Sequence, residues 1–377
     1  MASVTEKLSE SYKAAKRAVS SAPSNDAYLA WDAPGVETVK LDEEVKAQAI
    51  AETMNRMQKH NFDKHRHAFR ATHVKTQGIV KGKLSVLLDL PSHLRQGIFA
   101  EPGKTYDVAA RYANEPVFLQ PDQAAGPRGS SMKVFGVRGE LLEDGNKSSP
   151  TQDFFFNNAP MIELTDIDTC LEIMQLREKH FDDPMTLKVK TALRTDAVKQ
   201  TAPFLLPSTN LVSIDFYTQS AFRFGDFYGH IALFPADDAM TEKASEKVKS
   251  GQSSEALSEW LKEYLEKRGV KYHIKLQLGT DPAHHPTEDA SVVWDEATAP
   301  YQTLGLLEFP PQNSFSPERR AFWEDHMLLD PWGGLAAHRP LGSINRLRKI
   351  VYRQSQQQRD RLNATKSWDV GSIDQIP

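Results

Sequence analysis

The fold class is decided by three neighbouring pieces of sequence: GIVKGKLSVLLDL (78–90), TYDVAARYA (105–113) and SMKVFGVRGELL (131–142). Each piece is short and contains several branched or aromatic residues. The residues that separate the pieces favour turns: Pro91, Gly103, Pro116, Pro127 and Gly129. Short strand-like pieces with turn residues between them are typical of antiparallel strands. We therefore expect an antiparallel β-body that begins near Ala71.

A helix followed directly by a strand is expected further along the chain. SSEALSEWLKEYLEKRG (253–269) carries apolar residues at the spacing of an amphipathic helix, and its last glycine supplies a stop. VKYHIKLQL (270–278) alternates apolar and polar residues, which predicts a strand with one buried face. Other helical patterns lie within residues 41–60, 166–181 and 343–363, so the sequence predicts an α+β protein.

The N-terminal 60 residues are polar and read as a helical arm on the main body. In the helical pattern of residues 41–60, we expect Val45, Ala49 and Met54 to face inward. No internal repeat or low-complexity linker interrupts the rest of the chain. One integrated domain with an N-terminal arm and a late C-terminal helix is the simplest organisation.

Composition excludes several classes of protein. The chain has 377 residues, of which 40% are hydrophobic and 25% are charged, as in an ordinary globular domain. The formal net charge is −4, so no basic excess indicates a nucleic-acid partner. No apolar run is long enough for a transmembrane helix. We therefore expect neither nucleic-acid binding nor a transmembrane segment.

The single cysteine, Cys170, restricts both compartment and metal chemistry. One thiol can form neither an internal disulfide nor a cysteine-rich metal site, so any metal centre must use oxygen or nitrogen ligands. The N-terminus lacks the apolar segment of a signal peptide, and the C-terminal DQIP is not a peroxisomal address. We expect a cytoplasmic protein.

Three local patterns carry residues suited to chemistry, and each has an ordinary structural explanation. RATHVK (70–75) places His73 at the start of a strand, where a histidine is more often structural than catalytic. DFFFNNAP (153–160) places Asn157 after three aromatic residues, as a strand that ends in an asparagine turn also does. RKIVY (348–352) places Arg348 one helical turn before Tyr352, a spacing that packing pairs share.

In this order and together, the three patterns resemble the haem-dependent catalase superfamily, and in particular its short, catalase-related branch. The resemblance covers roughly residues 60 to 360. Its main matches are Arg70, His73 and Lys75; Arg111, Tyr112 and Ala113; Arg128, Gly129 and Lys133; Asn157, Asn158 and Pro160; and Arg348 and Tyr352. Lesser matches to the short branch are FRFGD (222–226), PTEDAS (286–291) and HRPLGSINR (338–346).

The resemblance implies a catalase-type antiparallel β-barrel core that encloses a haem b, with helices packed on it. It implies a haem domain at residues 61–365, after an arm at 1–60 and before a tail at 366–377. Tyrosine is the haem ligand of catalases, so Tyr352 is the expected ligand of the ferric iron, with Arg348 as the cation that favours its phenolate. The expected propionate partners are Arg70, Arg111 and Arg359.

On the other face of the haem, the resemblance implies that His73 is the general base and that Asn157 orients the bound peroxide. Two residues depart from hydrogen-peroxide catalases: Thr72 stands where valine is usual, and Ala113 stands where serine is usual. Both are similar to the allene oxide synthase type, which rearranges fatty-acid hydroperoxides. Thr72 is therefore a third candidate catalytic residue, although strand parity would turn it away from His73 unless the strand is irregular there.

The resemblance leaves three functions open. The preferred one is an enzyme that acts on organic or fatty-acid hydroperoxides. The second is a small catalase or peroxidase that decomposes hydrogen peroxide, and the third is a haem-binding or sensor protein without turnover. A small-molecule peroxide or lipid hydroperoxide is the expected partner, and a homodimer is left open.

Overall fold

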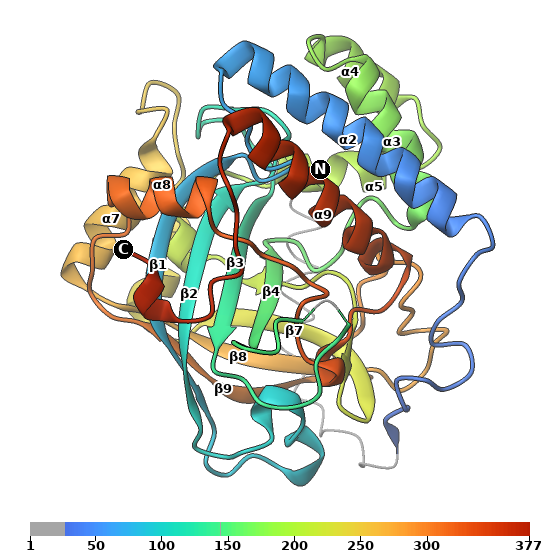
Figure 1. The fold of residues 1–377 in the computed structure, drawn as a ribbon, viewed down its shortest axis with the longest axis vertical. Helices are drawn as coiled ribbons and strands as arrows, with labels where there is room; N and C mark the ends of the chain where they lie inside the picture. The colour runs from blue at the N-terminus through green and yellow to red at the C-terminus, as the bar shows by residue number, and fades with distance from the viewer. Residues whose placement is uncertain (1–26, 144) are drawn as a thin grey trace, which may run out of the picture.

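A computed structural model places residues 27–143 and 145–377 around one antiparallel sheet (Figure 1). The sheet order is β5-β4-β3-β2-β1-β9-β8-β7-β6, and β5 also pairs with β7, so eight of the strands close into a barrel. The strands are β1 (Lys75–Val86), β2 (Thr105–Asn114), β3 (Arg128–Phe135), β4 (Thr151–Asn157), β5 (Phe216–Tyr217), β6 (Phe222–Phe224), β7 (Phe227–Pro235), β8 (Val270–Leu278) and β9 (Tyr301–Phe309). The expected antiparallel barrel of an α+β protein is confirmed.

The inside of the barrel is a packed core. Alternate residues of each strand point inward, as Val108, Ala110 and Tyr112 do on β2 and Phe154 does on β4, and all four are buried in one apolar cluster. An eight-stranded barrel is just wide enough for its interior to be filled by side chains. The residues between these positions point outward, toward the helices.

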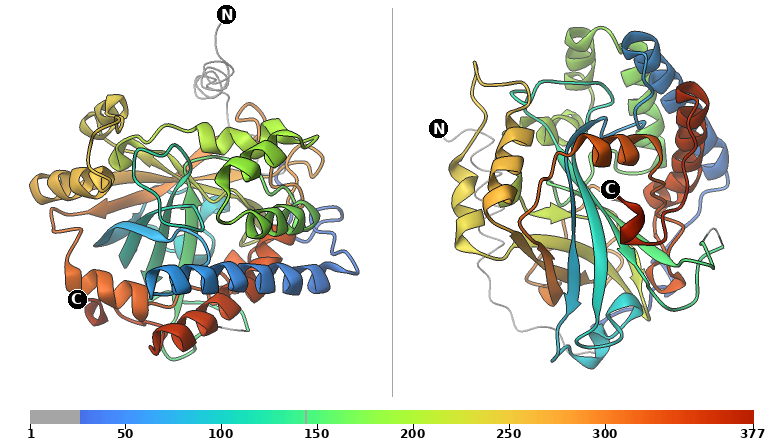
Figure 2. Two further views of the ribbon diagram at one scale, coloured as in Figure 1. Left: turned by 90° about the horizontal axis from the view of Figure 1, so that it is seen from above. Right: turned by 60° about the vertical axis from the view of Figure 1, so that its left-hand side comes forward.

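Eight α-helices lie outside the barrel in the described part of the chain (Figures 1 and 2). They are α2 (Glu43–His65), α3 (Ile167–Lys179), α4 (Pro184–Ala192), α5 (Ala197–Thr201), α6 (Asp238–Thr241), α7 (Ala256–Lys267), α8 (Pro317–Asp325) and α9 (Ser343–Asn363). Helices α2, α3 and α9 pack together on one side of the barrel, with α4 and α5 at the edge of this layer. No helix of the placed residues is long and apolar enough to cross a bilayer.

The helical patterns are largely where the sequence predicts them. Helix α7 buries Leu257, Leu261 and Leu265 on one face, and α9 covers the whole of the expected segment 343–363. In α2 the prediction for Val45 is wrong, because this side chain is 73% exposed. The prediction for Met54 is confirmed, whereas Ala49 is only partly buried. The inward face of α2 is formed by Ala47, Ile50, Ala51, Met54 and Met57. Residues 1–26 of the expected N-terminal arm lie outside the described residues.

The last twelve residues, 366–377, run along the outer wall of the barrel. The Trp368 N–H donates to the His326 carbonyl oxygen at 2.9 Å, and Asp369 lies 3.2 Å from the buried ammonium of Lys133 on β3. Val370 and Ile376 are buried. The C-terminal segment is thus packed on the body, and the proposed domain boundaries stay a prediction.

Candidate functional site

A cavity of about 190 Å³ lies between the outward face of β2–β4 and helix α9. Strand alternation explains which side chains reach it, since Arg111 and Ala113 of β2 and Phe155 and Asn157 of β4 all point away from the barrel core. Helix α3 and the segment before β1 close other sides of the cavity.

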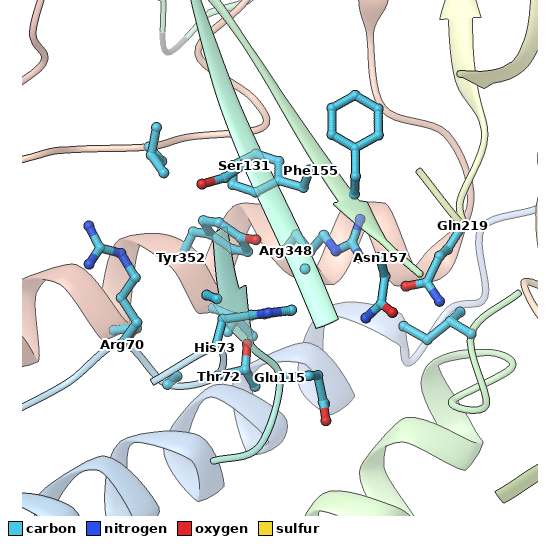
Figure 3. A pocket seen from close by; sticks show the side chains of 18 of the residues that line it. Arg70, Thr72, His73, Glu115, Ser131, Phe155, Asn157, Gln219, Arg348 and Tyr352 are labelled. Atoms are coloured by element: carbon cyan, nitrogen blue, oxygen red, sulfur yellow. The ribbon is translucent and has the colours of Figure 1, made fainter. Parts of the chain in front are cut away.

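All eight site residues that the sequence predicts line this cavity: Arg70, Thr72, His73, Arg111, Asn157, Arg348, Tyr352 and Arg359. They come from the segment before β1, from β2, from the end of β4 and from α9, which are far apart in the sequence. In Figure 3, the side chains of His73, Asn157, Arg348 and Tyr352 point into the same space. The structure therefore brings the predicted set together, while the role of each residue stays a prediction.

His73 lies two residues before β1, so this segment enters a strand as predicted, although His73 itself precedes the regular part. Its backbone is left-handed, with φ of 55°, a conformation that costs roughly 1 kcal/mol or more for a residue with a Cβ. Two hydrogen bonds hold it there: the His73 N–H donates to the Glu115 carbonyl oxygen at 2.9 Å, and Arg111 Nη2 donates to the His73 carbonyl oxygen at 2.6 Å. The irregular backbone lets Thr72 and His73 both face the cavity.

The imidazole ring of His73 lies against the backbone of β3. A Cβ added to Gly129 would come within 2.3 Å of ring atom Cε1 and 2.5 Å of Nδ1, so the ring needs a glycine at this position. No described residue forms a hydrogen bond with the ring. Burial, together with the nearby cations Arg111 and Arg348, lowers the pKa of His73 to about 3. The ring is therefore neutral near pH 7 and can accept a proton.

Tyr352 and Arg348 lie one turn apart on the cavity side of α9. The Tyr352 ring packs edge-on against Phe155 of β4, with 5.0 Å between ring centroids, and its hydroxyl forms no hydrogen bond with any described residue. Arg348 Nη1 donates to Asn345 Oδ1 at 2.7 Å, which fixes the guanidinium on the same helix. Burial raises the pKa of Tyr352, and the charge of Arg348 opposes this increase. An additional cation is needed to make the phenol ionise near pH 7.

Three guanidinium groups lie around one buried carboxylate at the other end of the cavity. Arg70 Nη1 and Arg111 Nε lie 2.9 Å and 3.3 Å from the two oxygens of Glu324. Although burial alone would raise it, these two cations lower the pKa of Glu324 to about 2. Arg359 is buried, and its Nε has no hydrogen-bond partner within the described ranges. Burial and the charge of Arg70 lower the pKa of Arg359 to about 9.

Solved structures of three catalases resemble the chain. A fungal catalase is 15% identical with a TM-score of 0.58, over 82% of this chain and 65% of that one. Catalase A from Saccharomyces cerevisiae is 14% identical with a TM-score of 0.59, over 80% and 63%. A bacterial catalase is 16% identical with a TM-score of 0.53, over 92% and 67%. The chain has the catalase fold.

The likeness to catalases is one of fold. The chain spans 65% and 63% of the length of the fungal and yeast catalases. No protein-family profile matches the chain, and no curated protein matches its sequence. The catalase fold is therefore confirmed, and membership of a short branch stays a prediction.

The residues at this site of the catalase fold suit a haem. Two buried polar atoms on the cavity wall, Asn157 Oδ1 and Arg359 Nε, have no partner in the part of the chain that is placed. Three arginines face a single carboxylate at one end, which leaves positive charge available for anionic groups. Among the described residues, no cluster of three or more His, Cys, Asp or Glu could hold a bare metal ion. A single tyrosine ligand with arginines for propionates is consistent with this donor set.

Sequence reasoning missed a polar group on the cavity wall near Thr72. Glu115, directly after β2, lines the cavity, and its Oε2 has no partner within residues 27–143 and 145–377. Its other oxygen lies 3.7 Å from Arg177 of α3, and Arg177 also pairs with Glu163 at 3.0 Å. Burial raises the pKa of Glu115 to about 7. Nothing local in the sequence indicates this group, because its members come from three separate segments.

Gln219 was also missed. It lies in a left-handed conformation with φ of 61°, lines the cavity, and donates from its side chain to the Met161 carbonyl oxygen. Figure 3 places Gln219 beside Asn157. The sequence pattern FRFGD begins only three residues later, but it gives no sign that Gln219 itself faces the site.

Proposed function

We propose that the protein is a haem-dependent enzyme that processes peroxides, with organic or fatty-acid hydroperoxides as its preferred substrates. One observation carries this proposal: all eight predicted site residues line a single cavity in a chain with the catalase fold. Coincidence is a poor explanation, because these residues are drawn from segments that span residues 70 to 359.

The haem would be held by α9 and by the arginine cluster. Tyr352 would supply the axial oxygen, and Arg348 would favour its phenolate form. Arg70, Arg111 and Arg359 would bind the propionates, with Arg359 using the Nε that now lacks a partner. When bound, a ferric haem with a phenolate ligand supplies the redox chemistry that cleaves the O–O bond.

His73 and Asn157 would handle the peroxide. The Nδ1 side of the His73 ring rests on Gly129, so we assign Nε2 as the nitrogen that accepts the hydroperoxide proton and returns it to the departing oxygen. The low pKa of His73 keeps the ring neutral near pH 7, so it does not already hold the proton that it is to accept. Asn157 would donate from its amide to the peroxide and fix its orientation. Proton transfer by a positioned group is typically worth about 10²–10⁴ in rate.

The walls of the cavity favour a substrate with an alkyl group. Ile162, Leu164, Met174 and Pro203 add apolar surface to the cavity that His73 and Asn157 also line. Hydrogen peroxide has no apolar group that could be buried against this surface, whereas burial of an alkyl or acyl chain against it is favourable. Thr72 and Ala113, the two departures from hydrogen-peroxide catalases, favour the same choice.

A parallel assay with two substrates tests the proposal. The haem-loaded protein is incubated separately with hydrogen peroxide and with a fatty-acid hydroperoxide, and oxygen release and lipid products are measured. We expect faster turnover of the lipid hydroperoxide. Rapid oxygen release from hydrogen peroxide without a lipid product would instead support a small catalase, which the neutral His73 and Asn157 also allow.

The haem ligand is tested by Tyr352→Phe. We expect the variant to lose the absorption spectrum of a phenolate-ligated ferric haem. Tyr264→Phe on α7 is the matched control, because Tyr264 does not line the cavity, and its spectrum should stay that of the unsubstituted protein. An unchanged spectrum in Tyr352→Phe would remove the ligand assignment.

A further inference from the structure

An exposed apolar face covers α4, α5 and the short 3₁₀ helix η4 (Ala202–Leu205). Helix α4 has no buried residue, although Met185, Val189 and Leu193 follow one another every four residues along one of its sides. Val198 and Leu205 continue the face, and all five side chains are 50% to 76% exposed. Twelve large hydrophobic side chains are exposed in the described chain, and five of them lie in these 21 residues. Such a concentration marks an interaction surface.

Two lysines flank the apolar stripe of α4. Lys188 and Lys190 flank Val189, so they lie about 100° to either side of the apolar stripe on α4. Neither lysine forms an ion pair with a described residue. A helix with an apolar stripe flanked by lysines is typical of segments that lie in a membrane interface, where lysine stems bury and the ammonium groups reach lipid phosphates.

The acidic groups of the same segment are engaged elsewhere. Asp182 pairs with Lys64 and His60 of α2, and Asp183 caps α4 by accepting from the Thr186 N–H at 3.0 Å. Asp196 pairs with Arg194 at 2.7 Å. Residues 182–205 carry four cations (Lys188, Lys190, Arg194 and Lys199) and three carboxylates (Asp182, Asp183 and Asp196), so the segment has a formal charge of +1, although the whole chain has a net charge of −4. This local positive charge complements an anionic lipid surface.

The η4 part of the face lies next to the cavity. In η4, Pro203 lines the cavity, and Leu205, two residues later, is exposed on the outer face. Between them, the Phe204 ring packs on the guanidinium of Arg177, with 5.5 Å between the ring centroid and Cζ. One layer of residues thus separates the outer apolar face from the site, and α4 projects from the edge of the molecule (Figures 1 and 2).

We propose that the outer face of α4, α5 and η4 binds an anionic phospholipid surface and takes lipid hydroperoxides from it into the cavity. The binding step stands on the surface itself, and the delivery step rests on the proposed function. Apolar side chains enter the acyl region, and Lys188 and Lys190 contact the phosphate groups.

Vesicle sedimentation tests the binding step. The full chain is spun with vesicles of phosphatidylcholine, with or without phosphatidylserine, at low and high salt. We expect it to pellet with the anionic vesicles at low salt. We expect vesicle binding to fall by about tenfold or more in each of two double variants, Met185→Glu/Leu193→Glu and Lys188→Glu/Lys190→Glu. Leu88→Glu is the matched control, since Leu88 is 83% exposed on the segment after β1, at the opposite end of the barrel from α4.

The outcomes separate the possible occupants of the face. Failure of the full chain to bind anionic vesicles overturns the proposal. A dimer that Met185→Glu/Leu193→Glu converts into a monomer, with vesicle binding unchanged, also overturns it and identifies the face as a contact between copies. Circular dichroism shows whether each variant is folded, and binding by the folded Leu88→Glu control with loss in both double variants supports the proposal.

The delivery step is tested by comparing the turnover of two hydroperoxides. The double variants should lose turnover of a phospholipid hydroperoxide in vesicles and keep turnover of a small, water-soluble alkyl hydroperoxide. Equal loss of both would overturn delivery. If the unsubstituted protein turns over neither substrate, the proposed function fails while vesicle binding still decides the surface.

Discussion

His73 combines a strained backbone with a neutral ring. The left-handed conformation is held by hydrogen bonds to Glu115 and Arg111, and the ring is held by Gly129. The three neighbours that fix the histidine thus belong to β2, to the residue after it and to β3. A base whose position is fixed from three sides needs little reorganisation when it accepts a proton.

Two substitutions at residue 73 separate strain from chemistry. His73→Asn and His73→Ala should both lower peroxide turnover by about 10²–10⁴, because both remove the base. Asparagine tolerates the left-handed region better than alanine does. We therefore expect the free energy of unfolding of His73→Ala, measured with urea, to be about 1 kcal/mol lower than that of His73→Asn. Equal urea stability of the two variants would show that the conformation at residue 73 is not strained.

Glu115 makes stability depend on pH. Its pKa is raised to about 7 in the folded protein, against about 4.5 when unfolded, because the buried site disfavours the charged form. Folding stability associated with Glu115 is therefore present below pH 4.5 and is lost as the pH rises through 7. Glu115→Gln removes this loss, so the variant should gain on the order of 1–3 kcal/mol over the unsubstituted protein between pH 5 and pH 8.

Urea unfolding at the two pH values measures this difference. The exposed Leu88→Ala is the control, because it removes no titratable group, so its stability relative to the unsubstituted protein should be the same at both pH values. If the stability of Glu115→Gln relative to the unsubstituted protein is the same at pH 5 and pH 8, Glu115 is already charged in the folded protein at pH 5.

At the scale of elements, Gly129 makes the approach of β3 to the segment before β1 possible. Gly129→Ala would force a Cβ into the His73 ring, so the ring or the strand must move. We expect a loss of roughly 1–3 kcal/mol in stability, as for other overpacked sites, together with a large loss of turnover. Gly333→Ala is the control, because its nearest neighbour would be 3.4 Å away. Full activity in Gly129→Ala would show that the ring position is not critical.

The regular elements could be predicted because their signals are local. The alternation in β8 and the apolar stripe of α7 each depend on about ten consecutive residues, and the structure has both. The inward face of α2 was misjudged at Val45 because contacts with α3 and α9, rather than the pattern of α2 alone, decide which side is covered.

The candidate site was predictable only where a short motif carried it. His73, Asn157 and Tyr352 sit in recognisable patterns, and the structure brings them to one cavity. The left-handed backbone at His73 depends on Arg111 and Glu115, which are about 40 residues away in the sequence. The Glu115–Arg177–Glu163 group forms only when α3 is laid against the end of β2, and no local signal describes that contact.

At the scale of the molecule, the cavity between the barrel wall and α9 contains buried charged groups whose hydrogen bonds are incomplete. Arg359→Met replaces a buried guanidinium whose Nε has no partner, so we expect the haem-free protein to gain about 1 kcal/mol or more in stability. The same variant should release haem faster to an acceptor protein, because a propionate partner is lost.

The test is whether Arg359→Met makes the haem-free protein more stable and at the same time makes the loaded protein release haem faster. Urea unfolding of the haem-free protein and the rate of haem release are measured for Arg359→Met and for Arg353→Met, an exposed position on the same helix. Arg353→Met should change neither quantity. Faster haem release in Arg353→Met, or slower release in Arg359→Met, would remove Arg359 from the cofactor site.

The filled interior of the barrel has a consequence for how substrate reaches the site. Because apolar side chains of the described residues fill the barrel axis, we expect substrate to reach the cavity from outside the barrel wall, between the helices and loops that line it. Size selection therefore depends on the elements outside the barrel that line the cavity, such as α3, η4 and α9, whereas mechanical support depends on the strands. Changes in the helical cover can then alter which peroxides are admitted without loosening the scaffold that aligns the reacting groups.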